Sequence, residues 1–281
     1  MLFSSVAYAE EAAQKPNYLN YFKDTVFQKL INADASVWIT LGALVALGLI
    51  LLFIGKSQKK WTAKMIAYGA LSIALSFVLS YIRLFRMPQG GSITPGSMLP
   101  IMLFSAAYGV GPGLLTGLVY GLLQYLQGGD FLNVWQFLFD YLIAFAALGL
   151  AGLHKYMKAA WWRYAVPAVT LILLVGMAFA YPDLIVLYIV LGLVAAALLY
   201  LVYKHPDRSE LLPAMGVAVL GRAVSAILAG LMWVAAYPLE DGQLPLIYSI
   251  VYNGAYLVPE LTICMVLAVS MGDRVYKQMK Q

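Results

Sequence analysis

Long apolar runs separated by short polar stretches fill most of this 281-residue chain. A helix needs roughly 17 to 25 apolar residues to cross a bilayer. Runs of this kind, two of them shorter, cover residues 36–54, 65–84, 97–108, 112–126, 134–153, 164–180, 184–203, 211–237 and 247–271. Lipid offers the backbone no hydrogen-bond partners, so the runs predict helices, and there is no alternating strand pattern. We therefore expect an all-α integral membrane protein. The two short segments flank a Gly- and Pro-rich turn, 108–113, and must be tilted or buried against neighbours.

The composition excludes several classes of protein. Only 11% of the residues are charged, against about 25% in soluble domains. The single cysteine, Cys264, lies in an apolar run, so neither a disulfide nor a cysteine metal site is available. The net charge of +5 comes from basic residues beside apolar segments. That pattern indicates membrane topology, so we expect a lipid bilayer and no nucleic acid as partner.

The basic residues also predict the orientation in the membrane. One arrangement of the predicted helices across the membrane places twelve of the 18 Lys and Arg residues on the same side of the bilayer. They lie in the stretches 55–64, 154–163, 204–208 and 274–280. The positive-inside rule makes that side cytoplasmic. We therefore expect the N-terminus outside, the C-terminus in the cytoplasm, and the loops 87–97 and 238–245 outside.

The N-terminal region leaves two points open. Residues 1–10 end in a small-residue pattern typical of signal-peptide cleavage, but without a basic start, so they are either a signal remnant or an ordinary exported tail. Residues 17–33 have an apolar helical face. They form either an amphipathic helix on the outer surface or a lead into the run 36–54.

Three charged residues stand inside apolar runs, away from the ends of the runs: Asp140, Arg222 and Glu260. Such residues are costly in lipid and therefore mark a functional site or a structural ion pair. Asp140 lies six residues into its run, about 9 Å below the outer surface at 1.5 Å per residue. Asn253 lies at a similar depth, whereas Arg222 and Glu260 lie near the middle of their runs.

Aromatic residues accompany Asp140 and Asn253 at the outer end of the runs: Tyr141, Tyr248, Tyr252, Trp233 and Tyr237. An interfacial belt of Tyr and Trp would produce the same distribution, but would not explain a carboxylate and an amide. Aromatic walls with one carboxylate suit a flat organic cation. An amide and an arginine add directional hydrogen bonds.

The stretch "RMPQGGSITPGSMLP", residues 86–100, is a polar interruption with three Gly and three Pro. A plain connector needs only a few residues. We therefore expect this stretch to be a lid over a ligand pocket.

Four blocks, "MPQGGSITPGSMLP", "GLVYGLLQYLQGG", "FLFDYLIAFAALGLAGL" and "YSIVYNGAYLVPE", together resemble the thiamine-specific substrate-binding (S) component of energy-coupling factor (ECF) transporters. The resemblance covers about residues 62–153 and 210–272. It implies a six-helix core, an extracellular lid after the first core helix, and thiamine captured near the outer surface of a bacterial cell membrane. It also implies a transmembrane coupling subunit and two cytoplasmic ATPases as partners, which hydrolyse the ATP, with no cofactor on this chain.

The resemblance also implies roles for individual residues. The substrate-binding residues would be Asp140, Tyr141, Arg222, Trp233, Tyr248 and Asn253, with no catalytic or metal-binding residue. The lid would comprise Gln89, Gly90, Gly91 and Ser92. Ala67, Ala70 and Ala74 would form a smooth face for docking to the coupling subunit.

This chain departs from the family pattern in the run 211–237. Ala226 stands where a His is expected, and Val234 where a Trp is expected. Trp233 comes one residue earlier, which turns its side chain by about 100° on a helix. A looser thiamine site, or a site for a pyrimidine or thiazole precursor or another vitamin, is therefore an alternative.

About three helices are additional to the six of the core. The expected organisation is an N-terminal segment with one extra helix (1–60), core helices one to four (61–153), an inserted transmembrane hairpin (154–209), and core helices five and six with a cytoplasmic tail (210–281). No polar residue in the inserted helices suggests chemistry. We expect them to pad the core.

Two other classes of function are alternatives for such a chain. A membrane enzyme needs a nucleophile with a base or a set of metal ligands. The only histidines, His154 and His205, lie in predicted cytoplasmic loops, and the sequence contains no HExxH, GxSxG or Walker A motif. The chain is therefore not expected to be an enzyme. A stand-alone secondary transporter is the second alternative, but no repeated halves and no midplane site are evident.

Overall fold

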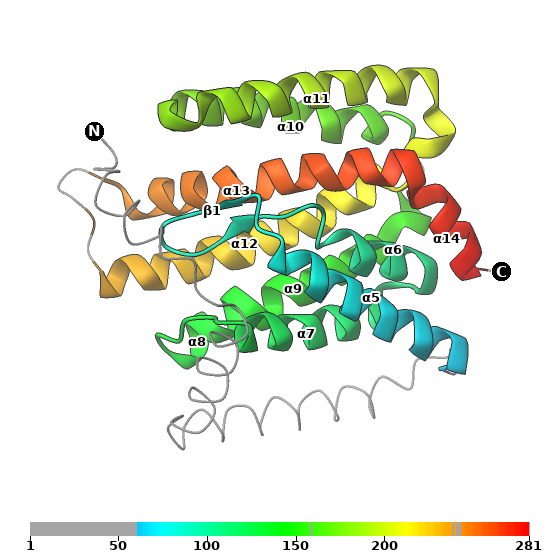
Figure 1. Ribbon diagram of the computed structural model, residues 1–281, viewed down its shortest axis with the longest axis horizontal. Coiled ribbons are helices and arrows are strands. Elements are labelled where there is room, and N and C mark those ends of the chain that lie inside the picture. The colour runs from blue at the N-terminus through cyan, green and yellow to red at the C-terminus, as the bar shows by residue number, and fades with distance from the viewer. Residues whose placement is uncertain (1–60, 158, 238, 240–242, 281) are drawn as a thin grey trace.

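The computed structural model describes residues 61–280 apart from 158, 238 and 240–242. Six of its helices are long and apolar enough to cross a membrane, and two shorter apolar helices accompany them (Figure 1). The described elements therefore match eight of the nine predicted segments. The run 36–54, the stretch 17–33 and residues 1–10 lie outside the described residues. The all-helical membrane fold is confirmed, with one small hairpin as the addition.

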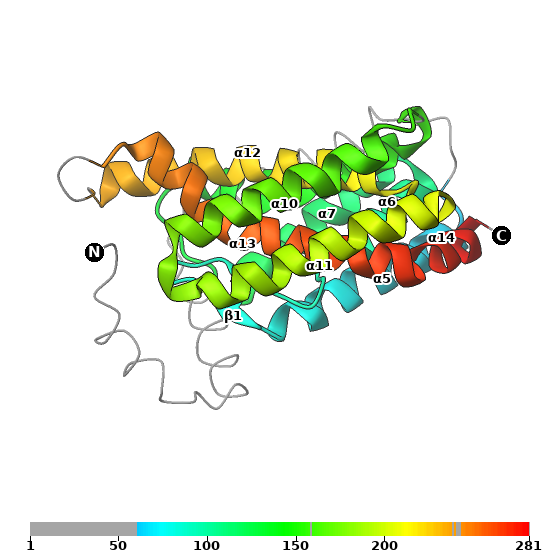
Figure 2. The ribbon, with the colours of Figure 1, turned by 90° about the horizontal axis from the view of Figure 1, so that it is seen from above.

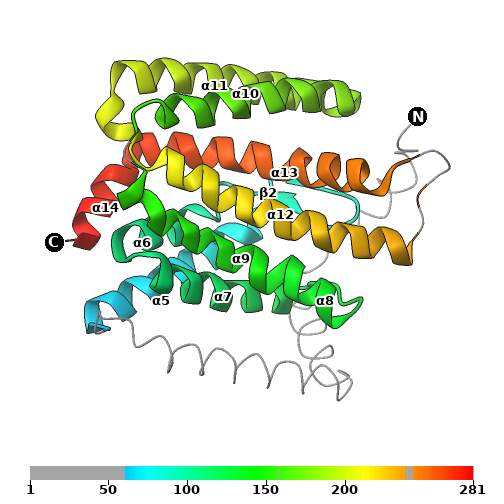
Figure 3. The same cartoon turned by 180° about the vertical axis from the view of Figure 1, so that it is seen from behind.

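The elements follow one another along the chain as a helical bundle with one two-stranded hairpin. They are α5 (Ala63–Tyr81), β1 (Phe85–Arg86), β2 (Ser92–Ile93), α6 (Leu99–Tyr108), α7 (Val110–Leu126), α8 (Val134–Phe137), η2 (Leu138–Ile143), α9 (Ala144–Ala146), η3 (Ala147–Tyr156), α10 (Trp162–Ala180), η4 (Pro182–Leu184), α11 (Ile185–Lys204), η5 (Pro206–Ser209), α12 (Leu212–Ala236), α13 (Pro245–Leu267), η6 (Ala268–Gly272) and α14 (Asp273–Lys280). Seen from behind, α12 lies between α13 and the 134–156 helix, with α7 and α5 beyond (Figure 3).

The two short helices, α6 and α7, meet at Gly109, whose φ of +105° suits glycine. Nearly every residue of α6 is buried, because α5, α7, η3 and α14 pack around it. This confirms that the short segments lie against neighbours and meet in a tight turn.

A row of glycines on α7 brings it against the 134–156 helix. A methyl group at Gly117 would overlap the carbonyl oxygen of Phe145, and one at Gly121 would overlap that of Tyr141. Small residues four apart are the usual means of close approach between helices in lipid. They hold the helix that carries Asp140 at a fixed distance from α7.

The 134–156 helix changes winding along its length. It runs through α8, a π-helical turn (η2), α9 and a 3₁₀ stretch (η3). Asp140 and Tyr141 lie in the π-helical turn, a feature often found at functional sites. Ser225 of α12 donates a hydrogen bond of 2.6 Å to the carbonyl of Phe139 in this turn.

The predicted insertion is a hairpin of α10 and α11, which pack against each other and against α13. The two helices cover one flank of the bundle (Figure 2). That the hairpin only pads the core stays a prediction; its placement shows that it packs along α13.

The two ends of the bundle differ. The start of α5, the end of α11 and α14 gather at one end, and α8 and the end of α12 lie toward the other (Figure 1). Basic residues mark the first end, among them Lys64, Lys204, Lys277 and Lys280.

Candidate functional site

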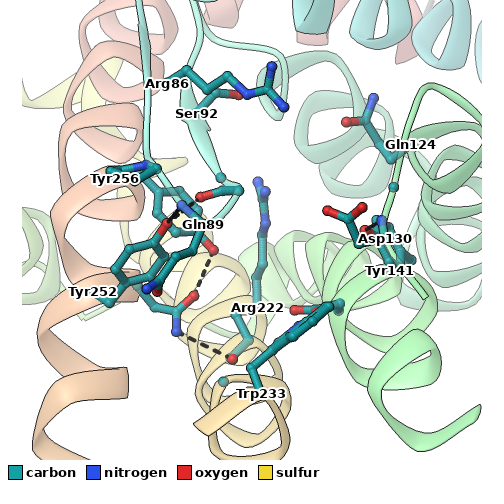
Figure 4. Close-up of a pocket in the computed structure, with 18 of the residues that line it drawn as sticks. Arg86, Gln89, Ser92, Gln124, Asp130, Tyr141, Arg222, Trp233, Tyr252 and Tyr256 are labelled. Carbon is teal, nitrogen blue, oxygen red and sulfur yellow. Dashed lines mark hydrogen bonds between the residues drawn. The ribbon is translucent and has the colours of Figure 1, made fainter. Parts of the chain in front are cut away.

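A cavity of about 770 Å³ opens among α5, the β1–β2 hairpin, α7, the 134–156 helix, α12 and α13. Small-molecule sites commonly have volumes of about 300–1,000 Å³. All six predicted binding residues and all four predicted lid residues line it, together with Ser80, Arg83, Arg86, Thr94, Ser97, Gln124, Gln127, Asp130, Ala226, Val234, Tyr252, Tyr256 and Glu260, among others. Residues from separate parts of the sequence thus meet around one space (Figure 4).

Asp140 is held in the cavity wall by two donors. Gln136 Nε2 donates to its Oδ2 at 2.5 Å, and Trp233 Nε1 donates to the same atom at 3.0 Å. Trp233 itself stacks on Tyr237, with ring centroids 5.8 Å apart. The one-residue displacement of the tryptophan on α12 therefore does not remove it from the cavity.

Arg222 and Glu260 form a buried ion pair, with Arg222 Nη1 3.8 Å from Glu260 Oε2. Glu260 is 1% exposed and accepts hydrogen bonds from Thr94 Oγ1 at 2.6 Å and Ser97 Oγ at 2.8 Å. The guanidinium carbon of Arg222 lies 4.3 Å from the centre of the Phe145 ring. Its Nη1 makes no hydrogen bond within the described residues.

The structural alternative for intramembrane charges thus applies to Arg222 and Glu260, which form an ion pair. Asp140 is held instead by an amide and an indole. Arg222 also reaches into the middle of the cavity, between α13 and the side that carries Tyr141 (Figure 4). Arg222 therefore both pairs with Glu260 and lines the cavity.

The predicted lid contains the antiparallel β1–β2 hairpin. Phe85 pairs with Ile93 across the strands, and Gly90 and Gly91 turn the chain with φ of +93° and +80°. A methyl group at Gly91 would approach the ring of Tyr256 to 2.7 Å. Only glycine combines that backbone angle with that contact.

Tyrosines of α13 hold the hairpin tip. Tyr248 donates from its hydroxyl to Gln89 Oε1 at 2.7 Å. The hydroxyl of Tyr252 donates to the Gly90 carbonyl at 2.7 Å and accepts from the backbone N–H of Gln89 at 2.9 Å. The hairpin is thereby fastened across one side of the cavity.

Asn253 joins α13 to α12 at the cavity. Its Nδ2 donates to the Ser249 carbonyl at 2.9 Å and to the Ala226 carbonyl at 3.3 Å. Its Oδ1 accepts from the Tyr256 hydroxyl at 2.7 Å. The side chain therefore sets helix geometry as well as lining the cavity.

Several lining residues were missed by the sequence analysis. Tyr252 was noticed only as an aromatic, and Tyr256 not at all, although both share the helical face of Tyr248 at four-residue spacing. Gln124 and Gln127 were also missed. They are amides in or directly after an apolar helix, the same signal that revealed Asn253.

The two glutamines form a polar cluster with Ser80. Gln124 Nε2 donates to Ser80 Oγ and to Gln127 Oε1, both at 2.9 Å. The Nε2 of Gln127, a residue only 6% exposed, makes no hydrogen bond within the described residues. A hydrogen-bond acceptor on a bound ligand would satisfy this N–H donor.

The three predicted docking alanines, Ala67, Ala70 and Ala74, are exposed on the outer face of α5. The opposite face of that helix is buried and carries Gly69 and a row of serines. The alanine face is therefore accessible to another helix.

Comparison with known proteins identifies the family. The model of the thiamine transporter protein family (Thia_YuaJ) matches residues 66–279, which is more than half of the chain. The chain belongs to this family. The family predicted from four sequence blocks is therefore confirmed, and the chain is a multi-pass membrane transport protein rather than an enzyme.

A curated relative and a solved structure agree with the family. The thiamine transporter ThiT of Bacillus subtilis (strain 168) is 28% identical over 214 residues, covering 75% of this chain and 91% of the relative. The solved structure of ThiT from Listeria monocytogenes matches with a TM-score of 0.53 and 19% identity, over 76% of this chain and 96% of that chain. The second likeness shows a shared fold.

Proposed function

We propose that this chain is the substrate-capture subunit of an ECF-type importer and that it binds thiamine in the cavity under the β1–β2 hairpin. The observation that carries the proposal is a carboxylate, Asp140, anchored by Trp233 in an aromatic cavity of a thiamine transporter family member. Thiamine combines a cationic thiazolium ring with an aminopyrimidine. Both rings favour aromatic faces, and the cation and amino group favour a carboxylate.

Each binding residue would make the contact with thiamine that suits its side chain. Asp140 neutralises the cation or accepts from the amino group. Trp233, Tyr141 and Tyr248 supply aromatic walls. Arg222 would donate directional hydrogen bonds to the pyrimidine nitrogens or to the hydroxyethyl group. Asn253, whose Nδ2 bonds to the backbone, would accept from thiamine through the second lone pair of its Oδ1. At Ala226 the cavity is wider than the expected His would leave it.

Gln89, Gly90, Gly91 and Ser92 would act as the lid, opening to admit thiamine and closing over it. The basic end of the bundle supports a cytoplasmic C-terminus and an outward-facing lid. The exposed Ala67, Ala70 and Ala74 would dock the transmembrane coupling subunit. Two cytoplasmic ATPases would then supply the energy.

Intrinsic fluorescence of the purified protein in detergent tests the ligand. Thiamine stacked between Trp233 and the cavity tyrosines should quench the emission in a saturable way at submicromolar concentration. Biotin, a vitamin that does not absorb at these wavelengths and has no cationic ring, serves as the control and should leave the emission unchanged. A response only to the separate pyrimidine or thiazole halves would reassign the ligand to a precursor. No response to thiamine or to either half would refute the proposal.

Transport in liposomes tests the importer class. Vesicles that contain this chain, the coupling subunit and the ATPases should accumulate thiamine only with ATP. Ionophores that abolish ion gradients should leave that uptake intact. Uptake by this chain alone, driven by an ion gradient, would instead establish a secondary transporter.

A further inference from the structure

Helix α13 carries a proline in its interior, Pro259. Proline has no backbone N–H, so the carbonyl four residues earlier loses its helical hydrogen bond. Here that carbonyl belongs to Ala255, which is completely buried. A backbone carbonyl without a partner is costly where no water can reach it. The Ala255 carbonyl therefore needs a hydrogen-bond donor from outside α13.

The donor comes from the predicted insertion. The hydroxyl of Tyr188 in α11 donates to the Ala255 carbonyl at 3.1 Å. Tyr188 is 1% exposed, so neither partner can exchange the bond for one to solvent. One side chain of the α10–α11 hairpin therefore supplies the bond that Pro259 removes.

The surrounding contacts place the hairpin directly on the backbone of α13. A methyl group at Gly254 would come within 2.7 Å of the Met177 side chain of α10, so only hydrogen at this position leaves room for that side chain as it lies. The ring of Tyr181 lies 6.4 Å from that of Tyr188. Figure 2 shows α10 and α11 along this flank. The hairpin thus meets α13 at Gly254 and Ala255.

The same part of α13 forms the cavity wall. Asn253 and Tyr256 are the immediate neighbours of Gly254 and Ala255, and both line the cavity. Tyr252, one residue earlier, holds the lid tip. Glu260 directly follows Pro259 and pairs with Arg222. A shift of the backbone at Ala255 would therefore displace residues on both sides of the proline.

We propose that the α10–α11 hairpin is a brace for the binding helix, and that Tyr188 is a positioning residue that replaces the hydrogen bond lost at Pro259. The inference rests on the proposed function, because it assigns the brace to the helix that would hold thiamine. It gives the hairpin a role in ligand affinity beyond filling space.

A double-mutant cycle on thiamine affinity tests the brace. Tyr188→Phe removes only the hydroxyl and should raise the thiamine Kd about threefold to tenfold, the range for one hydrogen bond between helices in lipid. Pro259→Ala restores an N–H that can bond to the Ala255 carbonyl. On that background Tyr188→Phe should change the Kd by less than about twofold, because the carbonyl no longer depends on the tyrosine. Tyr200→Phe, an exposed tyrosine of the same helix (63%), is the matched control and should leave the Kd unchanged.

The cycle separates the brace from simple packing. The inference would be overturned if Tyr188→Phe raised the thiamine Kd equally in the parent and in the Pro259→Ala background. It would also be overturned if Tyr188→Phe left the Kd of the parent unchanged. If the parent bound no thiamine, the proposed function would fail by itself. The same cycle on the thermal unfolding midpoint without ligand would then decide: a fall with Tyr188→Phe only when Pro259 is present supports the brace, and equal midpoints refute it.

Discussion

Replacing Glu260 by glutamine removes one charge from the buried pair at the base of the cavity. The side chain keeps its size, but Arg222 loses its counter-charge at 3.8 Å, and the hydroxyls of Thr94 and Ser97 lose a charged acceptor. Breaking one partner of a buried ion pair costs about 3–5 kcal/mol. Arg222 also lines the cavity, so we take the lower end, about 3 kcal/mol. At about 2–4 °C per kcal/mol, the unfolding midpoint should fall by about 6–12 °C.

Scanning fluorimetry in detergent measures this shift. Glu210→Gln is the matched control, because Glu210 forms an ion pair with Arg163 at 3.5 Å but its side chain is 55% exposed. Surface pairs contribute about 0–1 kcal/mol, so the control should shift the midpoint by at most about 4 °C. Equal shifts in the two variants, or a loss below about 2 °C for Glu260→Gln, would refute the reasoning that the pair is buried and coupled.

Three further substitutions test other parts of the account. Asn253→Ala should weaken thiamine binding at least about tenfold in calorimetry, since it removes a polar group of the cavity and the α12–α13 connection; an unchanged Kd would contradict that assignment. Tyr252→Phe removes both hydrogen bonds of its hydroxyl to the lid tip. It should speed thiamine release in stopped-flow fluorescence by about fivefold or more, and an unaltered rate would contradict the lid role. Gly117→Ala should lower the unfolding midpoint strongly, because the methyl group overlaps a backbone carbonyl. Gly176→Ala, which meets no atom within 4 Å, should not, and similar midpoints would refute close packing at α7.

The apolar runs predicted the helices well, because span length and the burial of backbone polar groups are properties of local sequence. The short pair α6 and α7 was also predictable, since Gly109 must stand between two segments too short to span the membrane alone. The π-helical turn at Asp140 was not predictable. It depends on contacts with α7 and α12 that are far away in the sequence.

The sequence predicted how deep in the membrane the site residues lie, but not which side chains they contact. Counting residues along each run put Asp140, Asn253 and Trp233 at one level, and the structure brings them around one cavity. The sequence could not show that Asp140 bonds to Trp233, whereas Arg222 pairs with Glu260, because pairing depends on how each helix is rotated in the bundle. Gln127, by contrast, directly follows an apolar run and could have been found by the signal that revealed Asn253.

The central claim is that the Asp140 carboxylate recognises a cationic vitamin in this cavity. Isothermal titration of thiamine into the parent and into the Asp140→Asn variant tests it most directly, because the substitution keeps the shape of the side chain and removes its charge. The account predicts saturable binding to the parent and a loss of at least about tenfold, or 1.4 kcal/mol, in the variant. Equal affinities of the two proteins would contradict it.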